Sequence, residues 1–283
     1  MTTFNLFGFL MICATVCPCN ARTADPSHQS ARLLLVGGRP VVDGVLSGGQ
    51  GPSRFLLDTA AESNQLDLTI ARKLGLTPTF QVEVVTATGV TLVPGAHLPE
   101  LTLGSVTAHH QEFLFSNLEG IHQLSSEIQG VLGQQFLSRF DYLLDFGGRR
   151  ITFGLSSPEG GSRLDFARVH GVPAIETSEG RLLLDSGTDS LVLFRSINSG
   201  PKARIFTNAG TSSVTVLPSL RLKIAGKDYR ASNAALLPQS PGREGGLLPT
   251  SLFRALYICN SENYVVLNPK IGRAERLHPQ GDR

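Results

Sequence analysis

Two aspartates that follow apolar runs in matching surroundings are the residues of this sequence best suited to chemistry. Asp58 follows Phe55-Leu56-Leu57, and Asp185 follows Leu182-Leu183-Leu184. A carboxylate at the end of a buried strand costs free energy unless it is hydrogen-bonded, paired or used in a reaction. After each aspartate come a hydroxyl residue, two small or hydroxyl residues, an acid and a serine, so segments 55–63 and 182–190 align without a gap.

A second pair of similar segments lies downstream, in the same order. Residues 130–140 (Gly-Val-Leu-Gly at the start) align without a gap on residues 246–256 (Gly-Leu-Leu-Pro), and each segment precedes a predicted hairpin. Two elements repeated in one order indicate an internal duplication. We therefore predict two similar lobes, at residues 31–156 and 169–270.

The remaining segments complete this organisation. Residues 156–162 are polar and turn-rich, so residues 157–168 are predicted to link the lobes, and residues 271–283 are predicted to be a tail. Thirty Gly, sixteen Pro and no Trp, with many Val, Leu and Thr runs, predict short strands and turns. Short helices are expected only near 70–76 and 135–140. The predicted fold class is all-β, with two pseudo-symmetric lobes of the β-barrel type and a cleft between them.

Matching positions in two such lobes place Asp58 and Asp185 face to face across a pseudo-twofold axis. Two carboxylates in close contact cannot both ionise, so they share one proton. One can then deprotonate a water molecule while the other protonates a carbonyl oxygen. This chemistry hydrolyses a peptide bond without a metal, a cofactor or a covalent intermediate. The hydroxyl groups of Thr59 and Ser186 are expected to hydrogen-bond across the lobe interface.

With these motifs the sequence resembles the aspartic peptidases, and most closely their bacterial retropepsin-like members. Asp185-Ser186-Gly187-Thr188 fits the family's Asp-Thr/Ser-Gly motif, and Val131-Leu132-Gly133 fits its second motif, which packs behind the catalytic loop. The resemblance covers nearly all of the chain after residue 31. It implies an acid-protease fold, an aspartic-type endopeptidase activity, catalytic Asp58 and Asp185, and supporting roles for Thr59, Ser186, Gly187 and Thr188.

Two positions depart from the family pattern. Ala60 stands where the first motif has glycine, and a methyl group there is expected to crowd the water or strain the loop. Pro249 replaces a packing glycine, which removes an amide and fixes φ. Two functions therefore stay open, an active aspartic endopeptidase and an impaired homologue that serves as a peptide-binding or structural module. Because Thr188 carries a hydroxyl and Ala61 does not, we expect Asp185 to favour the charged form and Asp58 the protonated one.

The resemblance also implies a flap that covers the cleft and grips the substrate strand. We place it in the hairpin around Thr86, Ala87, Thr88 and Gly89, and the alternative is an ordinary exposed hairpin. Peptides or unfolded proteins are the expected substrates. Because both lobes are present in one chain, we expect a monomer, an intramolecular pseudo-dimer.

The N-terminal segment favours export. Residues 4–16 are mostly apolar, as in a signal peptide, and Ala21 is a plausible cleavage point, although residues 1–21 contain no Lys or Arg. Cys13, Cys17 and Cys19 lie in this segment, and a lipid anchor on Cys17 is an alternative to secretion or a periplasmic location. The apolar run is too short to span a bilayer comfortably.

Composition argues against several other partners. The chain has 25 Lys and Arg against 23 Asp and Glu, a net charge of +2, without the basic stripe that nucleic-acid binding needs. His109 and His110 are adjacent in a predicted strand and point to opposite faces, so we expect no metal site. The Gly-rich residues 46–52 lack the features of a phosphate loop and are predicted to connect two strands.

Overall fold

The computed structural model describes residues 3–5, 29–49, 51–86, 89–195, 200–207, 210–238 and 245–271. The predicted leader lies outside these ranges except for β1 (Thr3–Asn5), and so does the tail except for residue 271. Among the described residues, no helix has the length and apolar character needed to span a bilayer.

Strands dominate the structure, which confirms the all-β prediction, and they form three large sheets and one two-stranded ribbon. The first lobe is an eight-stranded sheet. In spatial order its strands are β3 (Leu34–Val36), β4 (Arg39–Leu46), β5 (Ser53–Leu57), β10 (Ile128–Leu132), β6 (Gln65–Asp67), β9 (Val106–Ser116), β8 (Gly89–Leu103) and β7 (Phe80–Thr86). The Gly-rich residues 46–52 connect the antiparallel strands β4 and β5, as expected.

The second lobe is a nine-stranded sheet that includes β1 at one edge. Its other strands, in spatial order, are β18 (Lys202–Thr207), β19 (Gly210–Leu217), β22 (Ala234–Leu237), β17 (Leu191–Phe194), β23 (Gly246–Pro249), β16 (Gly180–Asp185), β15 (Val172–Thr177) and β14 (Ala167–Val169). The ribbon of β20 (Leu220–Ile224) and β21 (Lys227–Ala231) belongs to the same part of the chain.

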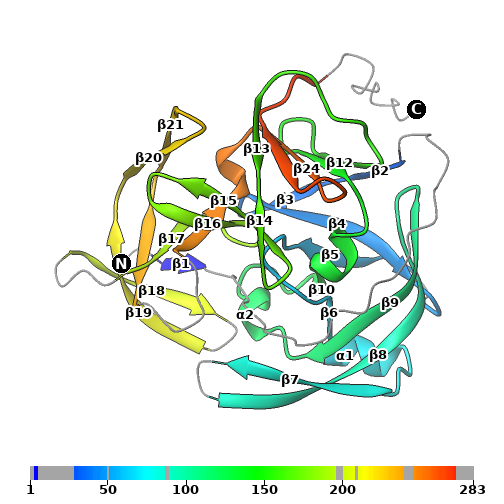
Figure 1. Ribbon diagram of the computed structural model, residues 1–283. Coiled ribbons are helices and arrows are strands. Elements are labelled where there is room, and N and C mark those ends of the chain that lie inside the picture. The colour runs from blue at the N-terminus through cyan, green and yellow to red at the C-terminus, as the bar shows by residue number, and fades with distance from the viewer. Residues whose placement is uncertain are drawn as a thin grey trace, which may run out of the picture.

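A six-stranded sheet joins strands from both halves of the sequence. Its order is β13 (Ser162–Asp165), β25 (Tyr264–Leu267), β24 (Ala255–Cys259), β11 (Tyr142–Asp145), β12 (Arg150–Phe153) and β2 (Gln29–Arg32). In Figure 1, β12, β13 and β24 lie at the top, above the second-lobe strands on the left and the first-lobe strands at lower right. Half of the segment predicted as a linker is therefore ordered as strand, because β13 pairs with β25.

The strand registers repeat between the lobes. In the first lobe Val131 of β10 pairs with Leu56 in parallel and with Gln65 antiparallel. In the second lobe Leu247 of β23 pairs in the same two ways with Leu183 and Val192. These pairs carry the sequence offsets of 127 and 116 residues that separate the repeated segments. The duplication seen in the sequence is thus also a duplication of hydrogen-bonded geometry.

Helices are few and short: α1 (Leu68–Lys73), α2 (Glu119–His122), α3 (Gln134–Leu137) and the 3₁₀ turn η1 (Thr250–Leu252). Asp67 caps α1 by accepting a hydrogen bond from the Thr69 amide at 2.7 Å. Gly75, at a φ of 65°, follows the C-cap Leu74, as expected for a left-handed helix end. The helix near 70–76 therefore begins two residues earlier than predicted, and α3 begins one residue earlier.

Candidate active site

The two aspartate loops are bound directly to each other by the hydroxyl residues that follow each aspartate. The Thr59 hydroxyl donates to the Leu184 carbonyl at 2.7 Å and accepts from the Ser186 amide at 3.0 Å. Reciprocally, the Ser186 hydroxyl donates to the Leu57 carbonyl at 2.7 Å and accepts from the Thr59 amide at 3.0 Å. Four buried bonds with matched lengths hold the ends of β5 and β16 together across the lobe interface, as the sequence predicted.

Each aspartate is held by the backbone of its own loop in the same way. Asp58 Oδ1 accepts from the amides of Ala60 at 2.9 Å and Ala61 at 3.1 Å. Asp185 Oδ1 accepts from the amides of Gly187 at 2.7 Å and Thr188 at 3.1 Å. Asp58 and Asp185 are 2% and 0% exposed. The structure therefore brings the two carboxyl groups together, each with one oxygen fixed by two donors.

The environment favours keeping a proton on this pair of carboxyl groups. Burial raises the pKa of Asp185 to about 7, although the amides of its loop and a guanidinium nearby oppose the shift. Burial and then the charge of Asp185 raise the pKa of Asp58 well above its usual range. Neither group has an ordinary carboxylate pKa, because both are withdrawn from water and face a like charge. Such an environment favours retention of a proton by the pair, which two coupled carboxyl groups can share.

Comparison with known protein families agrees with this geometry. Residues 42–136, which include Asp58 and most of the first-lobe sheet, match the family model described as aspartyl protease. This match agrees with the expected resemblance to the aspartic peptidases over the first lobe. Among solved structures, the chain is similar to a retropepsin-like aspartic protease from Rickettsia conorii, with 17% identity and a TM-score of 0.34, over 46% of this chain and 96% of that one. No curated protein matches the chain.

The predicted flap lies only partly in the described residues. Strands β7 and β8 form a long antiparallel hairpin in which Thr86 pairs with Gly89, so the hairpin itself is present. Ala87 and Thr88, the predicted tip, lie outside the described residues. In Figure 1 the hairpin runs along the lower edge of the first lobe.

The expected role of the Thr188 hydroxyl was wrong. This hydroxyl donates to the Ser190 carbonyl and accepts from the Ser190 amide, both at 3.3 Å, so it closes a local turn. The Thr188 amide, not its hydroxyl, bonds Asp185, and the Ala61 amide does the same for Asp58 at the same 3.1 Å. The difference between Thr188 and Ala61 therefore cannot explain an asymmetry between the two aspartates.

The exchange of glycine for Pro249 is compensated inside the second lobe. In the first lobe the amide of the equivalent Gly133 donates to the Asn64 side chain at 3.1 Å. The counterpart of Asn64, 127 residues further on, is the buried Leu191, which offers no acceptor. Because proline has no amide, Pro249 leaves no donor unpaired beside Leu191. The first lobe thus combines Gly133 with Asn64, which are hydrogen-bonded, and the second lobe combines Pro249 with Leu191, which have no donor and no acceptor to pair.

Ala60 also fits without backbone strain. It is not among the residues with positive φ, and its methyl group is buried in an apolar cluster formed mainly by the second lobe. Gly187 differs, because a methyl group there would lie 2.5 Å from Asp58 Oδ2 and 2.7 Å from its Cγ. The glycine of the second loop is therefore required by Asp58, whereas the first loop tolerates alanine.

Arg39, which no sequence pattern singled out, lies against the second aspartate loop. Arg39 begins β4, is 1% exposed, and its Nε donates to the Gly187 carbonyl at 2.8 Å. Its Nη2 lies 3.0 Å from Asp189 Oδ1. A fully buried arginine is rare unless it is paired, so this residue is a component of the site. A dipeptide Arg-Pro at a strand start carries no signal for such a role.

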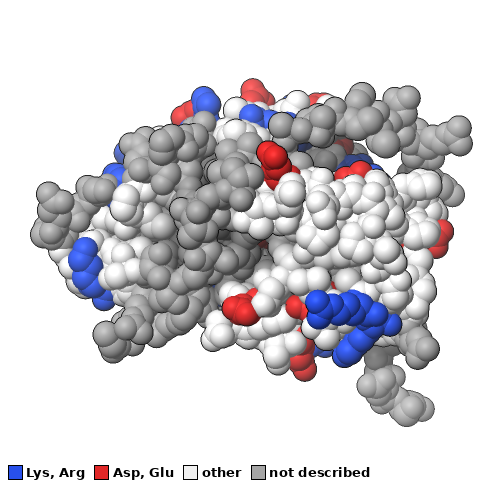
Figure 2. Space-filling model, turned by 90° about the horizontal axis from the view of Figure 1, so that it is seen from below, with Lys and Arg blue, Asp and Glu red and all other residues white. Residues whose placement is uncertain are grey.

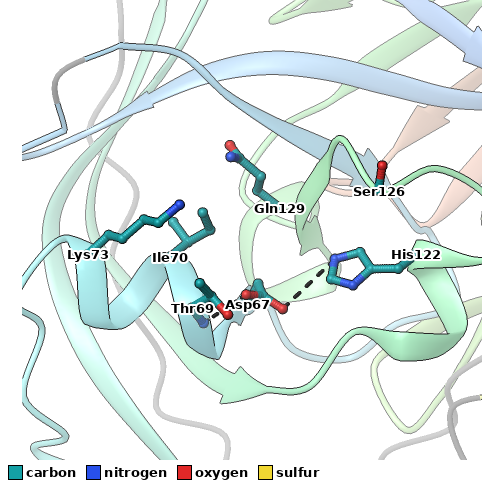
Figure 3. A pocket seen from close by; sticks show the side chains of 7 residues that line it. All are labelled: Asp67, Thr69, Ile70, Lys73, His122, Ser126 and Gln129. Atoms are coloured by element: carbon teal, nitrogen blue, oxygen red, sulfur yellow. Dashed lines mark hydrogen bonds and ion pairs between the residues drawn. The ribbon is translucent and has the colours of Figure 1, made fainter.

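A separate polar hollow lies beside α1 and α2 (Figure 3). It is lined by Asp67, Thr69, Ile70, Lys73, His122, Ser126 and Gln129. The Asp67 and His122 side chains point toward each other in Figure 3, with 3.9 Å between Asp67 Oδ2 and His122 Nε2, and that nitrogen also lies 3.1 Å from the Ile128 carbonyl. These partners give Asp67 and His122 structural roles, and no lining residue belongs to the aspartate loops.

The described residues contain no group of three or more His, Cys, Asp or Glu side chains placed to hold a metal ion. On the face shown in Figure 2, charged side chains stand in small separate groups among uncharged ones. His109, one of the adjacent histidines, lies at the surface with its Nδ1 3.2 Å from Glu100 Oε1.

Proposed function

We propose that this protein is an aspartic endopeptidase that hydrolyses peptide bonds with water activated between Asp58 and Asp185. One observation carries the proposal: two buried carboxyl groups, each fixed by two loop amides, sit on loops that are bonded to each other by matched hydrogen bonds. A structural module has no use for this arrangement, because burying two like charges side by side costs stability.

The reaction follows from one proton shared by two groups. The ionised aspartate removes a proton from water as the water oxygen bonds to the carbonyl carbon, and the protonated aspartate gives its proton to the carbonyl oxygen. The resulting gem-diol then collapses. The proton taken from water passes to the amide nitrogen as the C–N bond breaks, and a gem-diol hydroxyl returns its proton to the other aspartate. The pair ends in its starting state, with a carboxylic acid and an amine as products.

The fixed geometry accounts for which atoms take part. In each aspartate Oδ1 is held by two amides, which leaves Oδ2 for the reaction. Asp185 Oδ2 has no hydrogen-bond partner among the described residues, so this oxygen can accept the proton of a bound water. An extended peptide is the substrate expected beside the β7–β8 hairpin, because strands bind peptides by adding a strand.

The test is cleavage of a random peptide library by the purified protein between pH 3 and pH 8. We expect Asp58→Asn and Asp185→Asn each to abolish cleavage while the fold, followed by circular dichroism, is kept. Asp228→Asn, which changes an exposed aspartate of the β20–β21 ribbon, is the matched control and should cleave normally. Retention of most activity by either dyad variant would contradict the mechanism. Binding of library peptides without any cleavage would favour the peptide-binding module instead.

A further inference from the structure

The two lobes differ at one matched position beside the aspartate loops. Strands β3 and β4 pair with Val36 opposite Arg39, and β14 and β15 pair with Val169 opposite Val172. The next pairs also correspond, because Pro40 and Pro173 occupy equivalent places in the two registers. Val172 is therefore the counterpart of Arg39 in the second lobe.

These counterparts differ in what surrounds them. Arg39 reaches from the first lobe to the second loop, where it bonds the Gly187 carbonyl and pairs with Asp189. Val172, which is 0% exposed, lies in the same apolar cluster as Ala60 of the first loop. The guanidinium group of Arg39 thus binds the loop that contains Gly187, whereas Val172 shares an apolar cluster with Ala60 of the other loop.

We propose that Arg39 is a positioning residue that makes the pair asymmetric: it anchors the second loop and selects Asp185 as the base, so that the shared proton stays on Asp58. This inference rests on the proposed function for its catalytic consequence, but its electrostatic content does not require activity.

The hydrogen bonds inside the two loops cannot select the base. Both Asp58 and Asp185 accept two amide hydrogen bonds of similar length, so the difference must come from the groups around the loops. The charged groups that act on Asp185 besides its partner are Arg39, which lowers its pKa, and Asp189, which raises it. On Asp58 the charge of Asp185, which raises its pKa, acts more strongly than that of Arg39, which lowers it.

The proposal also explains why alanine is tolerated at position 60. In the first loop, residue 60 matches Gly187 and Glu62 matches Asp189, but no arginine comes from Val172. No guanidinium group binds the first loop at this position, and the methyl group of Ala60 is buried in the apolar cluster. Ala60 and Val172 are thus one matched pair, and Gly187 and Arg39 are the other.

The test follows both carboxyl groups directly, by NMR titration of the full chain labelled with ¹³C at the aspartate side-chain carboxyl, with signals assigned from Asp58→Asn and Asp185→Asn. We expect Asp185 to ionise before Asp58 in the wild type. Arg39→Gln should move the ionisation of Asp185 upward by about one pH unit, because a nearby arginine lowers a carboxyl pKa by roughly 1–3 units. Asp189→Asn should move it downward, since one negative charge is lost. The acidic limb of kcat/KM should move in the same directions.

Two controls separate charge from packing. Arg39→Lys keeps the charge and should keep Asp185 as the first group to ionise. Arg54→Gln removes an arginine of the same lobe that pairs with Asp43 and Glu127, and should leave both titrations unchanged. If Arg39→Gln does not fold, Asp189→Asn decides, because the Asp189 side chain is 39% exposed.

The outcomes distinguish the two proposals. Ionisation of Asp58 before Asp185 in the wild type, or unchanged Asp185 titrations in Arg39→Gln and Asp189→Asn, would overturn the role of Arg39. A wild type that titrates as expected but cleaves no peptide would refute the proposed function and leave the electrostatic role of Arg39 supported.

Discussion

Replacement of both aspartates by asparagine should change how the stability of the fold depends on pH. In the native state burial raises the pKa of Asp185 from 3.8 to about 7, and burial together with the charge of Asp185 raises the pKa of Asp58 well above its usual range. Between these limits the folded protein binds more protons than the unfolded chain. The free energy of unfolding therefore falls as pH rises through this window, and the stability is fully present only below the unfolded pKa.

The magnitude follows from the size of the shift. About three pH units at 1.36 kcal/mol each correspond to about 4 kcal/mol between pH 4 and pH 8. The double variant Asp58→Asn/Asp185→Asn has no carboxyl group to ionise at the site. Relative to wild type it should therefore gain at least this amount over the same range, because the raised pKa of Asp58 adds to the contribution of Asp185. The new side-chain amides cost about 1–3 kcal/mol where a buried donor has no partner, but this cost does not vary with pH.

Urea unfolding at pH 4, 6 and 8, at one ionic strength, measures the effect. The quantity to compare is the change with pH in the stability difference between variant and wild type, which cancels the constant cost of the amides. Asp228→Asn, on the exposed ribbon, is the control and should run parallel to wild type. A double variant that also runs parallel to wild type would refute the idea that the pair retains a proton when folded.

Three further predictions concern the aspartate loops and their support. Gly187→Ala places a methyl group 2.5 Å from Asp58 Oδ2, so we expect the carboxyl group to be displaced and kcat/KM for peptide cleavage to fall about 100-fold; Ala60→Gly, the reverse change, should instead cost about 1–2 kcal/mol in urea unfolding, because a buried methyl is lost and the backbone is freed. Asn64→Ala leaves the buried Gly133 amide without its acceptor and should cost about 1–3 kcal/mol by the same measurement, and a loss below about 1 kcal/mol would contradict the pairing described.

The amino-acid sequence by itself determined the duplication, the all-β class and the two aspartates. These features are written in short segments, in which an apolar run, an aspartate and a hydroxyl residue recur at matching places. An apolar run that ends in an aspartate can be recognised locally, because burying the run also buries the carboxylate that follows it. The cross-lobe bonds of Thr59 and Ser186 could be foreseen for the same reason, since each hydroxyl follows its aspartate directly.

Only the tertiary structure decided what surrounds the pair. Arg39 meets the Gly187 carbonyl across 148 residues of sequence, and no local pattern reports such a contact. The Thr188 hydroxyl was misassigned because its direction depends on the turn it closes with Ser190, not on its distance from Asp185 in sequence.

The same holds for the two departures from the family pattern. Ala60 and Pro249 look damaging when each is read alone, because a missing glycine is judged against a general rule. In the folded protein Ala60 belongs to the same apolar cluster as Val172. Leu191, the buried counterpart of Asn64, has no side-chain acceptor, so the missing amide of Pro249 leaves no hydrogen bond unmade. Whether a substitution strains a site depends on what lies within a few ångströms of it, and folding alone brings those neighbours together.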